Sequence, residues 1–243
     1  MKWTKTLVAA LVCTTALSAP ALAAKDDSAN VIAPEAHYTE EKAPANYNPA
    51  AKSSTRVNSI VPDAANPIIV LDPGHGGTDP GAVGNGIRES DVVLDIATRS
   101  KNYMAANYPA TLYMTRTADT TVSLESRASF ANSKGANIFV SYHINSYTSS
   151  TANGLEVYQY PGSTSSNQLS TNIYNKLKPY YSTLRGVKSA EFYVLKYTNM
   201  PASLGETGFI SNATDATNLK SATFKQNLAV GYAQGMHVYW WGF

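Results

Sequence analysis

The chain has 243 residues, of which 44% are hydrophobic and 15% are charged. This composition is typical of a globular protein and excludes a disordered or fibrous chain. The 19 basic and 17 acidic residues give a formal net charge of only +2, with no run of Lys or Arg. We therefore expect no nucleic-acid partner and no strongly anionic membrane surface as partner.

The N-terminus predicts a secretion signal at residues 1–23. Lys2 and Lys5 precede an apolar run at residues 7–19, and the small residues Ala21 and Ala23 are typical of a signal-peptidase site. A membrane anchor is the alternative, but the run is shorter than the ~20 residues that a spanning helix needs. We expect a secreted protein, outside the cell or in a periplasm, with no membrane anchor after cleavage.

The single cysteine, Cys13, lies inside the predicted signal. Val12 precedes it, where a lipoprotein signal places a small residue, so a lipid anchor is not expected. The mature chain then has no disulfide and no thiolate. Any metal ion must be bound by His, Asp or Glu.

Residues 24–66 are rich in Ala, Pro, Asn, Ser and Glu without a sustained hydrophobic period. This composition predicts a flexible linker or tether, with polymer binding as the alternative. The character changes at Pro67, where a β-branched run begins. We expect one catalytic domain over residues 67–243.

Within that domain, apolar runs of strand length alternate with segments of helical periodicity. Strands are predicted at residues 68–71, 111–115, 136–142, 155–160, 192–196 and 202–206, and helices at residues 89–108, 123–134, 167–180 and 222–238. This order predicts an α/β fold, a three-layer domain with a central, largely parallel twisted sheet flanked by helices.

Three polar residues lie at the margins of these elements, where ligands gather in open α/β sheets. His75 follows the first strand in a glycine-rich loop, Glu89 opens the first helix, and His143 follows the third strand. Two imidazoles and a carboxylate match the three protein ligands of a catalytic zinc site, which leaves its fourth position for water. The other histidines, His37 and His237, lack this context.

Glu206 is a carboxylate at the end of an apolar strand, between glycines at 205 and 208. Beside a zinc ion it could take a proton from the attacking water and return it to the leaving amine. Each residue also has a structural alternative. The histidines could be hydrogen-bonded loop or core residues, Glu89 could favour its helix N-terminus, and Glu206 could pair with a lysine.

Together these positions resemble the zinc-dependent N-acetylmuramoyl-L-alanine amidases. The resemblance covers residues 67–239 and includes LDPGHGG (71–77) with PGA (80–82), Glu89, SYHIN (141–145) and ETGFISN (206–212). It implies that His75, Glu89 and His143 bind one zinc ion and that Glu206 is the catalytic acid/base. It also implies a peptidoglycan substrate, cut between N-acetylmuramic acid and L-alanine, and therefore a cell-wall hydrolase or autolysin.

Asn145 and Arg185 are predicted as substrate contacts in the same cleft. Some relatives carry a long helical insertion over the zinc after the fourth strand, and this chain has only a short segment there, so we expect an uncovered site. Two other functions remain open: a zinc peptidase that cuts within the stem peptide, and a non-catalytic wall-binding module. The sequence predicts no oligomeric state.

Overall fold

The computed structural model describes residues 42–53 and 66–243, which belong to one compact unit. The predicted signal peptide and most of the predicted linker lie outside the described residues. Within the two described ranges, none of the helices has the length and apolarity of a membrane span.

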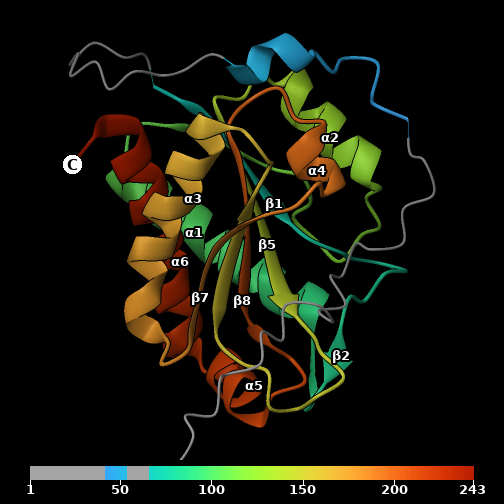
Figure 1. Cartoon of the computed structure of the whole chain (residues 1–243), viewed down its shortest axis with the longest axis vertical. Coiled ribbons are helices and arrows are strands. Elements are labelled where there is room, and N and C mark those ends of the chain that lie inside the picture. Colours follow the sequence, from blue (N-terminus) through green and yellow to red (C-terminus); the bar gives the residue numbers. More distant parts are fainter. Residues whose placement is uncertain (1–41, 54–65) are drawn as a thin grey trace, which may run out of the picture. The chain divides into compact units, whose positions relative to one another are not determined.

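A six-stranded sheet in the order β4-β1-β5-β8-β6-β7 forms the centre of the domain (Figure 1). Its strands are β1 (Ile68–Pro73), β4 (Thr111–Met114), β5 (Ile138–Asn145), β6 (Leu155–Gln159), β7 (Leu184–Ser189) and β8 (Ala202–Phe209). All neighbouring pairs are parallel except β6 and β8, which run antiparallel. The prediction of a largely parallel sheet in an α/β domain is confirmed.

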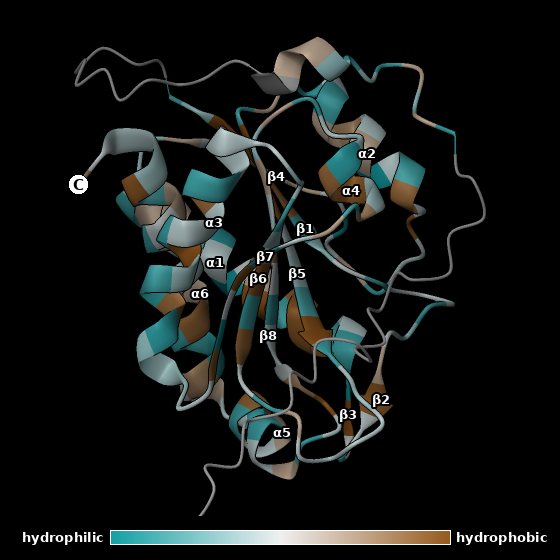
Figure 2. Ribbon diagram, viewed as in Figure 1, coloured by the Kyte–Doolittle hydropathy of each residue, from teal (hydrophilic) through white to brown (hydrophobic). Residues whose placement is uncertain are grey.

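Helices cover both faces of this sheet. The long helices α1 (Glu89–Asn107), α3 (Thr164–Leu177) and α6 (Ala222–Trp241) lie together on one face, and α2 (Leu124–Ser133) and α4 (Tyr193–Lys196) lie on the other (Figure 1). Figure 2 shows hydrophobic residues along the strands between these two layers. The remaining elements are the hairpin β2 (Val83–Gly84) and β3 (Ile87–Arg88), helix α5 (Ala213–Lys220), and the 3-10 helices at Pro49–Ser53 and Lys178–Tyr180.

The alternation of side chains along strand β5 shows on which face of the sheet His143 lies. Successive side chains of a strand point to opposite faces. Ile138, Val140 and the other even-numbered residues pack in the core beneath the long helices, whereas Phe139 packs in the core beneath α2 and α4. His143 has the same parity as Phe139, so its imidazole lies on the face of the sheet that α2 and α4 partly cover.

Capping residues fix where several helices begin. The side chains of Ser123, Ser163, Asn212 and Ser221 each accept a hydrogen bond from a backbone N–H in the first turn of α2, α3, α5 and α6. Caps of this kind contribute about 1 kcal/mol each. Helix α6 ends at Gly242, whose φ of 85° favours glycine.

The strand predicted at residues 192–196 is wrong, because residues 193–196 form the single turn α4, whose first three residues are buried. The strand of the six-stranded sheet that the prediction missed is β7, at the sheet edge, and the hairpin of β2 and β3 and helix α5 were missed as well. Helix α3 begins and ends three residues earlier than predicted, at Thr164 and Leu177. Only residues 160–163 join β6 to α3, so no inserted helix occurs there.

Part of the predicted linker contacts the domain. Asn199 accepts a hydrogen bond from the backbone N–H of Asn48 at 2.6 Å and donates to the backbone oxygen of Asn46 at 2.8 Å. The ring of Tyr47 lies edge-on to that of Tyr197, with centroids 5.2 Å apart. Residues 42–53 therefore lie against the end of α4.

Candidate metal centre

Three predicted residues come together at the carboxyl ends of β1 and β5. His75 follows β1, Glu89 is the first residue of α1, and His143 lies near the end of β5. One ligand atom from each lies within 4.8 Å of the others, and all three residues are buried. Within the described residues they are the one group of His, Asp, Glu or Cys side chains able to hold a metal ion.

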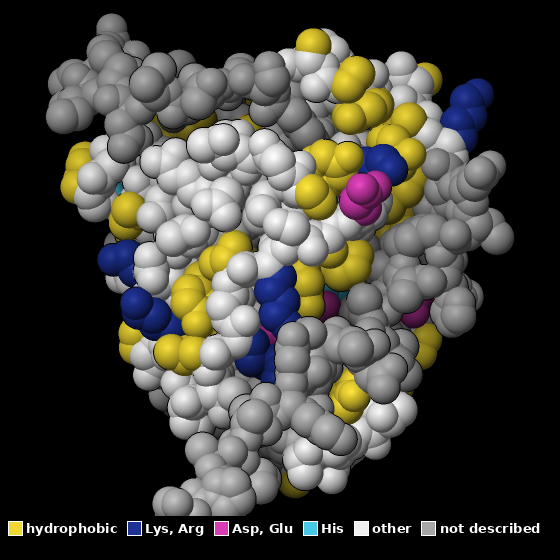
Figure 3. Space-filling view, viewed as in Figure 1, with side chains coloured by type: hydrophobic (Ala, Val, Ile, Leu, Met, Phe, Trp, Pro, Cys, Tyr) yellow, Lys and Arg dark blue, Asp and Glu magenta, His cyan; other side chains and the backbone are white. Residues whose placement is uncertain are grey.

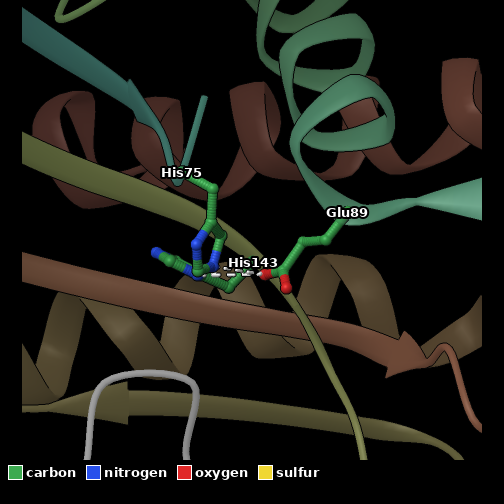
Figure 4. Close-up of side chains that lie close together, drawn as sticks. All are labelled: His75, Glu89 and His143. Atoms are coloured by element: carbon green, nitrogen blue, oxygen red, sulfur yellow. Dashed lines mark hydrogen bonds and ion pairs between the residues drawn. The ribbon is translucent and has the colours of Figure 1, made fainter. Parts of the chain in front are cut away.

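The two imidazoles converge on one carboxylate oxygen (Figure 4). Nε2 of His75 and Nδ1 of His143 each lie 3.1 Å from Oε1 of Glu89. The imidazole rings are steeply inclined at 77°, with centroids 4.9 Å apart. Nitrogen and oxygen donors thus face a common point from three separate elements.

The loop that carries His75 departs from ordinary backbone geometry. His75 has a φ of 57°, in the left-handed region, which costs a non-glycine residue on the order of 1–3 kcal/mol. Gly74 allows this loop to approach β5, because a Cβ atom at Gly74 would lie 2.3 Å from Cε1 of His143. Such strain persists only where surrounding contacts hold it.

Two buried arginines supply those contacts. Arg127 donates to the carboxylate of Asp72 at 2.8 Å and to the backbone oxygen of His75 at 2.7 Å. Arg116 donates to the backbone oxygens of Gly74 at 2.7 Å and Ser90 at 2.8 Å. Arg116 therefore joins the loop that carries His75 to the helix turn that begins with Glu89.

Hydrogen bonds also orient the side chains of the three candidate ligands. Oε1 of Glu89 accepts from the backbone N–H of Ile144, and Oε2 accepts from that of Ala82, each at 2.9 Å. Asp79 contacts Nδ1 of His75 at 2.7 Å, which leaves Nε2 directed at Glu89. A carboxylate on the outer nitrogen of a ligating histidine is the usual partner in zinc sites.

The charged groups of the cluster shift one another's pKa. Burial by itself would lower the pKa of His75, but the carboxylates of Glu89 and Asp79 raise it to about 9. Burial would raise the pKa of Glu89, but the neighbouring imidazoles lower it to about 2. The cluster therefore stabilises positive charge, either as a proton or as a bound cation that displaces it.

The donor set fits zinc. Imidazole nitrogen and carboxylate oxygen are zinc ligands, and three protein ligands leave a position for water or substrate. The short spacing, the burial and the outer hydrogen bond that His75 makes to Asp79 meet the criteria for a metal site. Asp79 and Arg116 were not predicted from the sequence. Only Asp79, four residues after His75, carried a local signal.

Glu206 lies beside this cluster. It is the register partner of His143 in the parallel pair of β5 and β8, and it is 1% exposed. Its other strand neighbour is Glu156 on β6, in the antiparallel pair with β8. The carboxylate predicted as acid/base is thus on the strand adjacent to a predicted ligand.

The two predicted substrate contacts differ in their surroundings. Asn145 is buried, and its side-chain oxygen accepts from the backbone N–H of Ser146 at 2.7 Å. Arg185 lies on β7 and pairs with the buried carboxylate of Glu156. His237 stacks on Tyr108, with ring centroids 4.2 Å apart, and is not one of the three candidate metal ligands.

Comparison with known proteins identifies one family, and its members are among the similar curated proteins. Residues 69–238 match the family described as N-acetylmuramoyl-L-alanine amidase. A sporulation-specific N-acetylmuramoyl-L-alanine amidase of Bacillus subtilis (strain 168) is 41% identical over 171 residues, which are 69% of this chain and 66% of the relative. The amidase LytC of the same strain is 40% identical over 197 residues, 79% of this chain and 39% of the relative.

Solved structures agree with these relatives. An N-acetylmuramoyl-L-alanine amidase from Clostridium difficile 630 superposes with a TM-score of 0.70 at 31% identity, covering 72% of this chain and 97% of that one. The chain therefore matches a whole solved domain of this kind, whereas it spans 66% and 39% of the length of the two curated relatives.

Proposed function

Because this chain belongs to the N-acetylmuramoyl-L-alanine amidase family, we propose that it hydrolyses the amide between N-acetylmuramic acid and the L-alanine of the peptidoglycan stem peptide. The observation that carries the proposal is the buried cluster of His75, Glu89 and His143 with Glu206 on the adjacent strand. The proposed cofactor is one zinc ion, held by the first three residues.

A zinc ion bound there would supply Lewis acidity toward the scissile carbonyl and toward a water molecule. The chain's own residues would supply orientation and proton transfer. Asp79 fixes the ring of His75, and the N–H groups of Ile144 and Ala82 fix the carboxylate of Glu89. Because these donors are held in place before substrate arrives, little reorganisation accompanies the reaction.

Glu206 is the proposed acid/base. Its carboxylate accepts a proton from the water that attacks the carbonyl carbon, and a new C–O bond forms. When the C–N bond breaks, Glu206 gives that proton to the departing amine of L-alanine. The products are a lactyl carboxylate on the sugar and an intact stem peptide with a free amine.

Asn145 and Arg185 are the proposed substrate contacts. Arg185 is a partly exposed cation on the same side of the sheet as Glu206. Asn145 retains side-chain N–H donors, since the hydrogen bond with Ser146 uses only its oxygen. The proposal also includes secretion, directed by the signal at residues 1–23. Residues 24–66 would then act as a tether, and the enzyme would act at the cell wall or in a periplasm.

A peptidase that cuts within the stem would use the same residues, so the products decide. Purified peptidoglycan is digested with the protein, with and without a chelator and zinc re-addition, and the soluble products are read by mass spectrometry. Intact stem peptides released only with zinc support the amidase, and cuts within the stem support the peptidase. Zinc binding without any product supports a wall-binding module.

A further inference from the structure

A second charged cluster lies on the same side of the sheet, and of its residues the proposed function above uses only Arg185. Its centre is the carboxylate of Glu156, which is completely buried. Tyr158 donates to this carboxylate at 2.5 Å and Lys188 donates at 2.9 Å, and Nε of Arg185 donates to its other oxygen. Three donors from β6 and β7 thus hold one acidic group.

Two cations pair with the carboxylate at the centre of the cluster, and Glu206 is the neighbouring carboxylate. One cation would neutralise Glu156, yet both Arg185 and Lys188 pair with it. Within the described residues, Glu156 is the only carboxylate that forms an ion pair with either of them. Their side chains remain 19% and 27% exposed, so both cations can be reached from solvent.

The position of the cluster relates it to the proposed acid/base. Glu156 is the antiparallel register partner of Glu206, and side chains of such a pair lie about 5 Å apart. Strand β7 lies one strand further from β8, at a spacing of about 4.8 Å. The cationic groups therefore lie roughly 5–10 Å from the carboxylate of Glu206.

The surface carries the same arrangement. Figure 3 shows Lys and Arg side chains gathered near the middle of this face, with acidic side chains recessed among them. The aromatic rings of Phe209 and Tyr158 lie 5.1 Å from Arg185 and 5.9 Å from Lys188. Contacts of this kind hold long cationic side chains in place and reduce the entropy lost on binding an anion.

We propose that Arg185 and Lys188 form a subsite for a free carboxylate of the substrate's peptide, that of its second residue. This rests on the proposed amidase function. The sugar carries no charge where the lactyl group is in amide linkage, so a cationic subsite suits the peptide side of the bond. A peptide advances about 3.5 Å per residue, and the second residue therefore falls within the estimated distance.

The test compares two synthetic muramyl peptides that differ only at the second residue, with a free carboxylate or its amide. We expect kcat/KM to be about tenfold higher for the free acid, the size of one charge-assisted hydrogen bond. Lys188→Gln and Arg185→Gln should bring this ratio toward one, and Arg185→Lys should restore part of it. Lys196→Gln, which removes an exposed cation of α4, is the matched control and should keep the wild-type ratio.

Zinc content measured for every variant separates loss of the subsite from loss of the metal centre. Equal rates on both substrates, with ratios unchanged in the variants, would overturn the subsite while leaving the amidase intact. A preference that follows a carboxylate further along the peptide would overturn the assignment to the second residue. Absence of cleavage of either substrate by the zinc-loaded wild type would instead overturn the proposed function.

Discussion

Glu206 on β8 is the register partner of His143 on β5, so a buried carboxylate stands on the strand next to a proposed zinc ligand. Adjacent parallel strands are about 4.8 Å apart, which places the proposed acid/base within reach of a water molecule at the metal. The parallel pairing of two strands far apart in the sequence creates this arrangement, and no local motif could.

Replacement of Glu206 by Gln should remove turnover and keep the metal. The amide retains the shape of the side chain but cannot accept the proton, so we expect kcat to fall by about 10²–10⁴-fold. Zinc content by atomic emission should stay at the wild-type level. Glu191→Gln, at an exposed ion pair on the surface, is the control. Activity of Glu206→Gln near that of the control would contradict the acid/base role.

Arg116 should act on the metal centre without touching it. Its hydrogen bonds join the His75 loop to the first turn of α1, so Arg116→Met should loosen the spacing of His75 and Glu89. We expect zinc affinity to fall by about 10–100-fold, as for other outer partners of zinc ligands. Competition with a chromophoric chelator measures this. Unchanged affinity in a folded variant would show that the loop holds its shape without Arg116.

Gly74→Ala should disrupt the site by contact alone. The added Cβ would lie 2.3 Å from the ring of His143, so the loop or the imidazole must move. We expect zinc stoichiometry to fall well below one. Gly135→Ala is the control, because its φ of 60° is strained for alanine but no atom lies within 4 Å of the new Cβ. That variant should lose about 1 kcal/mol of stability and keep its zinc.

Stability should depend on Asp72 in acid. Burial would raise the pKa of this carboxyl, but Arg127 and hydrogen bonds from Thr115 and Ser141 hold it below the ordinary value of 3.8. A depressed native pKa contributes stability above pH 3.8 that is lost as the pH falls through the native value.

Asp72→Asn should therefore be less stable than the metal-free wild type by about 3 kcal/mol at pH 7. The difference in free energy of unfolding, measured by urea denaturation, should shrink as the pH falls below 3.8. A difference that stays constant with pH would mean that the carboxylate charge contributes nothing. Both proteins are compared without metal, so titration of the proposed zinc ligands contributes equally.

The contacts of residues 42–53 predict a stability difference between two truncations. A chain that begins at residue 42 keeps the hydrogen bonds of Asn46 and Asn48 with Asn199, and one that begins at residue 54 loses them. We expect the shorter chain to be less stable by about 1–3 kcal/mol, with equal activity. Asn199→Ala in the longer chain should reproduce much of the loss. Higher activity of the shorter chain would instead indicate that the segment restrains the active site.

Most of the fold could be predicted because hydrophobic runs mark the central strands. Strand β7 was missed because an edge strand has one neighbour and is half-buried, and its sequence, LRGVKS, contains little apolar signal. Residues 192–196 were predicted wrongly because a run of only four apolar residues, 192–195, has no periodicity that separates a strand from one helical turn.

The proposed ligands could be predicted because each lies at the margin of a regular element. The charged residues around them, Arg116 and Glu156, could not be predicted to lie at the site. Arg116 donates only to backbone oxygens, which leave no mark in the sequence. Glu156 reads as an alternating polar residue of a half-buried strand, and only the folded sheet places it beside Glu206 and two cations.

The most direct test of the account is the position of oxygen incorporated during hydrolysis. Zinc-loaded protein is incubated with a muramyl peptide in H₂¹⁸O, and the products are fragmented by mass spectrometry. The amidase proposal predicts one ¹⁸O atom in the lactyl carboxylate of the sugar and none in the peptide. Label in a peptide carboxylate within the stem, with an unlabelled sugar, would contradict it.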